Sequence, residues 1–196
     1  MITKVCGMRD AENIRAVESL GVDWIGFIFW PKSSRYVAVP PAYLPIKAKR
    51  VGVFVDAAVS DVLQHVEDYG LDMVQLHGHE SPEYIKQLHG VSVIKAISIS
   101  SRDEVATYRD YEGAVDYFLF DTKCKTVGGS GEHFDWMVLD AYDGQTPFLL
   151  SGGIGPDDAE RLRCFHHPML AGIDLNSRFE QSPALKDINK LKQFLL

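Results

Sequence analysis

The chain has 196 residues, of which 46% are hydrophobic and 24% charged, with 27 acidic and 20 basic side chains. This composition is typical of a soluble globular protein, and the length fits a single domain over residues 1–196. The net charge of −7 argues against nucleic acid or an anionic membrane as a partner, because both recruit proteins through excess Lys and Arg.

The sequence shows no pattern typical of a membrane-spanning helix, a signal peptide or a disulfide framework. The longest uninterrupted apolar stretch, 24–30, has seven residues, whereas a membrane-spanning helix needs about 18. Lys4, Arg9 and Asp10 interrupt the N-terminal segment at once, which argues against a signal peptide. The three cysteines, at 6, 124 and 164, show no C-x-x-C spacing. We therefore expect a cytoplasmic protein with free thiols.

Apolar, β-branched runs alternate with helical patterns along the whole chain. The run 2–6 precedes a helical pattern over 10–20, and the run 24–29 precedes a proline-punctuated loop with a short element near 41–46. A third run, 51–55, is followed by helical spacing over 59–66, with Ser60 as a candidate helix cap. Further runs begin at Met73, Val91, Tyr117, Phe148 and Ala171, and the chain ends with Leu185, Ile188, Leu191 and Leu195 on one helical face.

The number and spacing of these runs predict the fold class. Eight runs start 18 to 31 residues apart, which is the count of an α/β chain that closes into a (β/α)8 TIM barrel of nearly minimal length. An open doubly wound sheet would show the same alternation but begins with a glycine-rich turn after its first strand. The segment 6–10 has a single glycine, so the barrel is favoured.

Active sites of such barrels lie at the C-terminal ends of the strands, where Cys6 and Asp121 follow the first and sixth runs. Cys6 is either a small buried hydrophobe or a base, and the second role requires its thiolate to be stabilised by a charge such as Lys4 or Arg9. Asp121 follows three large apolar residues and is either a proton donor or the cap of a turn at Thr122 and Lys123.

The loops after the seventh and eighth runs resemble a phosphate cradle. Barrels commonly bind phosphate at these two loops. The first contains Gly152 and Gly153, which allow close approach of the backbone to an anion, before Pro156 opens a helix. The second offers the amides and side chains of Asn176 and Ser177.

Three other loops carry polar groups. Arg35 can clamp a carboxylate at two points or remain a solvated loop charge. His77 and His79 resemble a metal cluster, but Gly78 favours a turn that separates them, and we expect no metal site. The widest gap holds a glycine-rich stretch over 121–134, whose length suggests a functional lid.

Taken together, these motifs resemble the phosphoribosylanthranilate isomerase family of tryptophan biosynthesis. The resembling segments, in chain order, are 4–9, 26–29 with 33–37, 51–54, 74–78, 120–122, 128–131 with 134–136, 150–154 and 172–177. The resemblance implies a TIM barrel. It also implies isomerisation of N-(5-phosphoribosyl)anthranilate to 1-(2-carboxyphenylamino)-1-deoxyribulose 5-phosphate by an Amadori rearrangement.

The resemblance also implies residue roles. Cys6 would be the general base and Asp121 the general acid, Arg35 would pair with the anthranilate carboxylate, and His77 and Asp174 would contact the substrate. The phosphate would lie against Gly152, Gly153, Asn176 and Ser177. No metal or organic cofactor is implied, the partner is the small phosphosugar–anthranilate substrate, and the chain would act as a monomer or a homodimer. Arg178 and Ala184 depart from the residues frequent in the family.

Two alternatives remain open at this stage. The histidine-pathway isomerase performs the same type of rearrangement, but it is usually longer, has two phosphate sites and uses carboxylates in both proton-transfer roles. A catalytically silent barrel would keep the phosphate loops and lose the acid or the base. The presence of Cys6 and Asp121, and the lack of a second glycine cradle after strands three and four, favour the first family.

Overall fold

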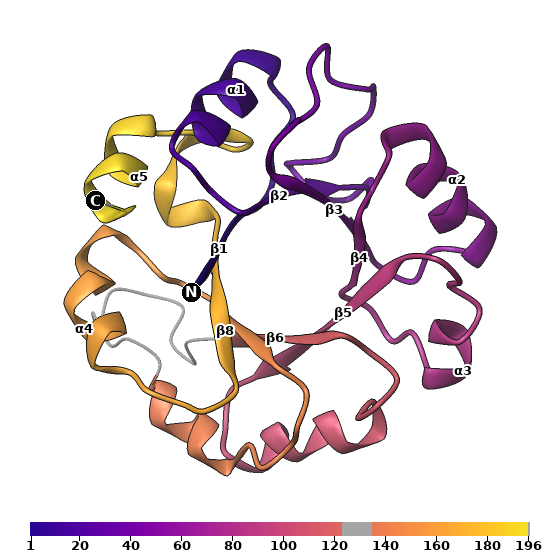
Figure 1. Ribbon diagram of the computed structural model, residues 1–196, viewed down its shortest axis with the longest axis vertical. Helices are drawn as coiled ribbons and strands as arrows, with labels where there is room; N and C mark the ends of the chain where they lie inside the picture. Colours follow the sequence, from indigo (N-terminus) through magenta and orange to yellow (C-terminus); the bar gives the residue numbers. More distant parts are fainter. Residues whose placement is uncertain (123–134, 196) are drawn as a thin grey trace.

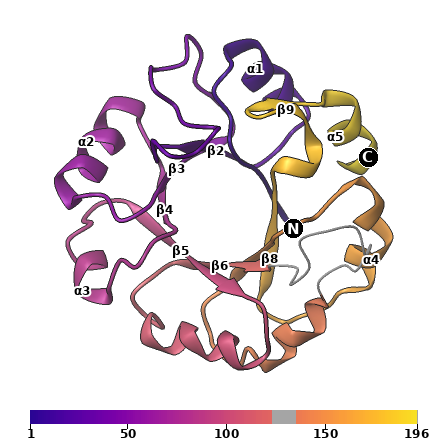
Figure 2. The same cartoon turned by 180° about the vertical axis from the view of Figure 1, so that it is seen from behind.

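The computed structural model describes residues 1–122 and 135–195. Eight parallel strands close into a barrel in the order β1 to β8 (Figure 1, Figure 2). Each strand begins within two residues of the predicted start, so the predicted barrel is confirmed. The strands are β1 Ile2–Val5, β2 Trp24–Ile28, β3 Lys49–Phe54, β4 Met73–Leu76, β5 Ser92–Ile99, β6 Tyr117–Thr122, β7 Phe148–Ser151 and β8 Leu170–Leu175.

Helices surround the barrel in both views (Figure 1, Figure 2). The α-helices are α1 Ala11–Ser19, α2 Val59–Tyr69, α3 Pro82–Ile85, α4 Ala159–Cys164 and α5 Ile188–Leu195, and short 3-10 helices are η1 Asp103–Asp110, η2 Trp136–Ala141, η3 Pro156–Asp158 and η4 Ser177–Phe179. The helices predicted at 10–20 and 59–66 are confirmed. The short element predicted near 41–46 is not formed.

The prediction that Ser60 caps α2 is wrong. The helix begins one residue earlier, at Val59, and its N-cap is Ala58, which has no side chain that could accept a hydrogen bond. Ser60 therefore lies within the first turn, where its hydroxyl is 3.4 Å from the Asp61 carboxylate. The helix ends at Gly70, whose φ of 56° is the left-handed conformation that glycine adopts without strain.

The barrel separates two apolar cores. The inner core fills the barrel with residues from β2 to β7: Trp24, Val51, Met73, Ile94, Ala96, Leu119 and Leu149. The larger outer core lies between the strands and the surrounding helices and includes Ile14, Phe118, Phe148 and Leu191, each with no exposed surface. Because the strands are covered on both faces, their sequences are almost continuously apolar, and this continuity made them visible in the sequence.

The C-terminal segment differs from the predicted single helix. Leu185 belongs to a small hairpin, β9 Glu180–Ser182 with β10 Leu185–Lys186, and is 37% exposed. The turn includes Ala184 at φ 68°, and the helical face starts only after Asp187, whose carboxylate accepts from the amides of Asn189 and Lys190. The leucine spacing therefore extends upstream of the true start of α5.

Two sequence predictions concern residues outside the described part of the chain. The proposed lid, 121–134, is described only at 121–122, and Cys124 falls within the remainder.

Within residues 1–122 and 135–195, no helix is both long and apolar enough to cross a membrane.

Candidate active site

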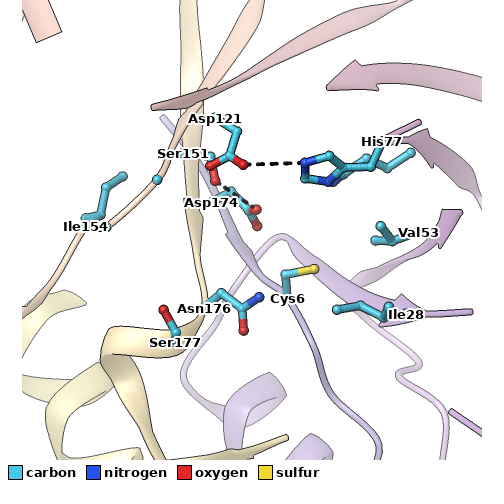
Figure 3. Close-up of a pocket in the computed structure, with 13 residues that line it drawn as sticks. Cys6, Ile28, Val53, His77, Asp121, Ser151, Ile154, Asp174, Asn176 and Ser177 are labelled. Atoms are coloured by element: carbon cyan, nitrogen blue, oxygen red, sulfur yellow. Dashed lines mark hydrogen bonds and ion pairs between the residues drawn. The ribbon is translucent and has the colours of Figure 1, made fainter. Parts of the chain in front are cut away.

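A pocket opens at the C-terminal ends of the strands, and all but one of the nine predicted site residues line it. Figure 3 shows Cys6 and Asp121 on opposite sides of the enclosed space. The predicted residue that does not line the pocket is Arg35. The lining residues are Cys6, Ile28, Val53, Gln75, His77, Asp121, Ser151, Gly152, Gly153, Ile154, Asp174, Asn176 and Ser177.

Cys6 follows β1 and is 3% exposed. Its amide donates to the carbonyl of Leu175, which continues the pairing of β1 with β8 up to the pocket. On the other side, Gly26 leaves room for the thiol, because a Cβ at this position would lie 2.7 Å from the Cys6 sulfur. The close approach of β1 and β2 therefore requires glycine here, and it fixes the position of the sulfur.

Of the two cations that the sequence offered to stabilise a thiolate, Lys4 is the one beside Cys6. It lies two residues earlier on β1, so both side chains are on the same face of the strand. Lys4 is completely buried, its Nζ is 2.8 Å from Asp174 Oδ1, and its charge acts on the Cys6 thiol. Arg9, the other cation considered above, instead reaches the carbonyls of Ser34 and Tyr36.

The two buried groups perturb one another. Burial raises the pKa of the Cys6 thiol, and the nearby Lys4 ammonium counteracts part of that rise. Burial alone would lower the pKa of Lys4, but the Asp174 carboxylate and Cys6 outweigh it, so the pKa of Lys4 is raised. Lys4 thus stays charged, and it provides the positive charge that a thiolate at position 6 requires.

Asp121 lies near the end of β6 and is paired in register with Ser98 and Ser151. Thr122 is the last residue of β6, and Lys123, the other residue of the turn that Asp121 was alternatively predicted to cap, lies outside the described residues. The Asp121 Oδ2 is 3.4 Å from His77 Nε2, an ion pair drawn as a dashed line in Figure 3. The Asp121 side chain is 22% exposed. The carboxyl group is therefore available to the pocket and has a histidine neighbour.

The two histidines after β4 separate as Gly78 predicted. His77 lines the pocket, whereas His79 is 97% exposed and lies 3.4 Å from Asp56. Gly78 is required because a Cβ there would lie 2.3 Å from Asp56 Oδ1. Among the described residues, no group of three or more His, Cys, Asp or Glu side chains is placed to hold a metal ion.

The predicted phosphate loops meet on the β7–β8 side of the pocket. Gly152 and Gly153 have φ values of 92° and 67°, which L side chains rarely adopt, so the loop conformation depends on glycine. Pro156 begins the 3-10 helix η3, as predicted for a helix start. Arg178 is exposed and packs against Gly155, where an added Cβ would lie 3.1 Å from Arg178 Nε.

Arg35 is held at the rim by an acidic residue that the sequence analysis missed. Its Nε and Nη2 donate to Glu180 at 2.8 and 2.6 Å. Lys186 Nζ lies 2.6 Å from the same carboxylate and 2.7 Å from Asn176 Oδ1. Burial alone would raise the pKa of Glu180, but its hydrogen bonds from Arg35 and Lys186 lower it to about 2. Two cations thus share one anion beside the pocket.

Two more residues of the site were also overlooked. Lys186 stands in what the sequence presents as a continuous leucine-spaced helix, and its burial depends on the hairpin, which carries no strong sequence signal. Gln75 lies inside the apolar run of β4. A single amide in a strand covered on both faces is a usable signal, because buried polar side chains need a partner.

Comparison with known proteins shows to which family the chain belongs. A family model described as N-(5'phosphoribosyl)anthranilate (PRA) isomerase matches residues 3–196. The chain belongs to this family. A relative named N-(5'-phosphoribosyl)anthranilate isomerase, from Parabacteroides distasonis, is 52% identical over 203 residues, covering 100% of this chain and 92% of the relative.

Solved structures of the isomerase family have the same architecture. The phosphoribosyl anthranilate isomerase from Thermus thermophilus superposes with a TM-score of 0.85 at 30% identity, covering 100% of this chain and 96% of that one. A second, solved in complex with reduced 1-(o-carboxyphenylamino)-1-deoxyribulose 5-phosphate, gives a TM-score of 0.82 at 29% identity and covers 100% and 97% of the two chains. The isomerase fold therefore extends over the full chain.

Proposed function

We propose that this chain converts N-(5-phosphoribosyl)anthranilate to 1-(2-carboxyphenylamino)-1-deoxyribulose 5-phosphate, a step of tryptophan biosynthesis. The observation that carries the proposal is the placement of Cys6 and Asp121 on opposite sides of one pocket that also contains the glycine loop after β7. An Amadori rearrangement needs both an acid and a base, whereas phosphate binding alone needs neither. The silent-barrel alternative is therefore disfavoured.

Each proton transfer is assigned to one of these groups. Asp121 in its acid form protonates the ring oxygen of the ribose, and the ring opens to a Schiff base. The Cys6 thiolate then removes the proton on C2, which gives an enolamine. The enolamine then takes up a proton at C1 and releases the proton of its C2 hydroxyl, which gives the ketone product. Protons are only moved, and no electron leaves the substrate, so the step requires no redox partner.

The remaining residues bind and orient the substrate. Gly152, Gly153, Asn176 and Ser177 hold the phosphate, and this positions the sugar between the β1 and β6 ends. Arg35 presents its remaining N–H groups to the anthranilate carboxylate while Glu180 fixes the plane of the guanidinium. Asp174, held by Lys4, and His77, beside Asp121, contact the sugar and the reacting atoms.

The test is the loss of fluorescence of phosphoribosylanthranilate, generated in the assay, on addition of purified protein. Turnover by the wild type is expected, and Cys6→Ala and Asp121→Asn are each expected to lower it by about 10²- to 10⁴-fold, the usual contribution of a positioned acid or base. Circular dichroism controls for folding. Folded variants with near-wild-type turnover would reject the two roles, and an inactive, folded wild type would reject the function.

A further inference from the structure

The floor of the pocket contains a polar atom without a partner. Gln75 lines the pocket and is 2% exposed, and its Oε1 is buried with no hydrogen-bond partner among the described residues. It is the only buried side-chain oxygen or nitrogen of this kind in residues 1–122 and 135–195. Buried acceptors are nearly always satisfied, so an orphaned one beside a ligand pocket indicates that a ligand atom supplies the partner.

The position of Gln75 in the barrel limits which part of a ligand it meets. Gln75 is on β4, two residues before His77 and on the same face, so it lies one step deeper than the histidine that contacts Asp121. In a closed barrel of eight strands, β4 lies opposite β8, which leads into the phosphate loop at Asn176 and Ser177. Gln75 is therefore on the side away from the phosphate.

The neighbours of Gln75 exclude an internal partner. Its register partners on the adjacent strands are Val53 and Ile94, which carry no polar side-chain atoms. The inner core beneath it is formed by apolar side chains such as Met73 and Leu119. An apolar residue of the same volume would pack equally well here, so packing alone does not account for an amide at this position.

We propose that Gln75 is a substrate-binding residue whose Oε1 accepts a hydrogen bond from a sugar hydroxyl or from the arylamine N–H next to the reacting carbons. This inference rests on the proposed function, because it takes its ligand from that reaction. Both donor types persist through ring opening, since the open-chain intermediates keep hydroxyls and the enolamine keeps its N–H. The contact thus helps hold C1 and C2 between Cys6 and Asp121 during the reaction.

The experiment replaces Gln75 by Met, which has a similar volume and no strong acceptor. Two affinities are measured without turnover: that for the reduced product, 1-(2-carboxyphenylamino)-1-deoxyribulose 5-phosphate after reduction, and that for inorganic phosphate. We expect Gln75→Met to lose about 10- to 100-fold in affinity for the reduced product, the range for one buried hydrogen bond left unpaired. The affinity for inorganic phosphate is expected to stay within a factor of about two to three, because the β7–β8 loops are untouched.

The matched control is Leu119→Met, an inward-facing residue of the same barrel with no surface in the pocket. It changes core packing to a similar extent and is expected to leave both affinities unchanged. Gln75→Leu serves as a second variant, so that poor folding of one substitution does not decide the result. Equal affinity of the wild type and both Gln75 variants for the reduced product would overturn the proposal, as would a parallel loss of phosphate binding, which would indicate general distortion.

The two proposals fail in different ways. A wild type that turns over substrate while Gln75→Met binds the reduced product equally well would leave the isomerase function intact and refute the role of Gln75. A folded wild type without turnover that still binds the reduced product, with a loss on Gln75→Met, would refute the reaction and retain the contact. A wild type that does not bind the reduced product at all would overturn the contact as well.

Discussion

Cys6 lies among charged residues from four parts of the fold. Lys4 on β1 and Asp174 on β8 form a buried ion pair beside it. Lys186 on β10 is a second buried cation that acts on the thiol. Arg35, which follows β2, is a third positive charge that interacts electrostatically with it. Positive charges stabilise a thiolate, whereas the negative charge of Asp174 destabilises it and raises the pKa of Cys6. The charge of Lys4 therefore has a direct consequence for the acidity of Cys6.

Replacing Lys4 by Met is expected to raise the pKa of Cys6 further, because the adjacent positive charge that favours the thiolate is removed. The alkylation rate of Cys6 by iodoacetamide at neutral pH should fall about 10-fold or more, and the acidic limb of the turnover profile should move to higher pH. The exposed Lys47 offers the control, because Lys47→Met removes the same charge away from the pocket.

Loss of Lys4 also leaves the Asp174 carboxylate buried without its partner, which is expected to cost about 3–5 kcal/mol of stability. Thermal melting therefore accompanies the alkylation measurements, and rates are compared well below each midpoint. A folded Lys4→Met variant with an unchanged alkylation profile would show that the lysine acts only through packing.

Gly153 allows the backbone contribution to phosphate binding to be measured separately. Its φ is +67° and a Cβ would meet no atom within 4 Å, so Gly153→Ala adds strain but no collision. We expect a loss of about 1–2 kcal/mol in stability, the usual cost of the left-handed conformation for a residue with a Cβ. We also expect weaker inhibition by phosphate, because the loop relaxes away from the binding conformation.

Gly113 provides the matched control, with φ +77° and the same absence of contacts around its Cβ, but outside the pocket. Gly113→Ala should lose similar stability and keep its affinity for phosphate. If phosphate inhibits both variants as strongly as the wild type, the glycine loop has no part in anion binding.

At the scale of elements, the β9–β10 hairpin connects the end of β8 to the first half of the barrel. Glu180 accepts from Arg35, from Lys186 and from the amide of Ala184, and the backbone of Lys186 exchanges two hydrogen bonds with the Asn13 side chain of α1. These contacts join residues far apart in the chain. The hairpin therefore fastens Arg35 and α1 to the β8 side of the pocket.

The pKa of Glu180 is about 2, compared with its ordinary value of 4.5. The stabilisation that Glu180 gains from Arg35 and Lys186 is therefore sensitive to acid. Because the folded-state pKa is the lower one, the stabilisation is complete above about pH 4.5 and is lost as the pH falls towards 2. We expect the difference in unfolding free energy between wild type and Glu180→Gln to be constant from pH 7 to about 5 and to shrink from there to about pH 2.

Urea unfolding at a series of pH values measures this difference. Glu160→Gln is the control, since Glu160 is 85% exposed in its pair with Arg163 and should give a small difference at every pH. A wild type that exceeds Glu180→Gln by the same margin at both ends of the pH series would contradict the assignment of this carboxylate.

The same hairpin marks where prediction from sequence ends. Strands such as the one predicted at 51–55 were visible because both of their faces are buried, and Cys6, Asp121 and the glycine loops were found because they follow such strands. Lys186 stands beside leucines at helical spacing, and the turn that pairs β9 with β10 depends on Ala184 adopting a φ of 68°, which the sequence does not signal. Ion pairs between residues 145 positions apart, such as Arg35 with Glu180, leave no local pattern.

At the scale of the whole molecule, the two ends of the chain close the barrel. β1 pairs with β8, and α5 lies beside α1 (Figure 1). With 196 residues, the chain has fewer than the roughly 250 typical of this fold, so little additional structure supports the closure. The eight βα units were predictable from the apolar runs alone. That closure of the barrel also involves contact between α5 and α1 is visible only in the structure.

Leu191 is the residue of α5 with no exposed surface, and it belongs to the outer core. Leu191→Ala is expected to lower the unfolding free energy by about 2–5 kcal/mol, the usual cost of a cavity at a fully buried leucine. Leu195, on the same helix but only partly buried, gives a smaller loss when replaced by Ala. Because Cys6 follows β1 and Asp174 is on β8, turnover should fall at a lower urea concentration in Leu191→Ala, together with the circular dichroism signal. Loss of activity well before the loss of helix would instead show that the pocket opens independently of the barrel.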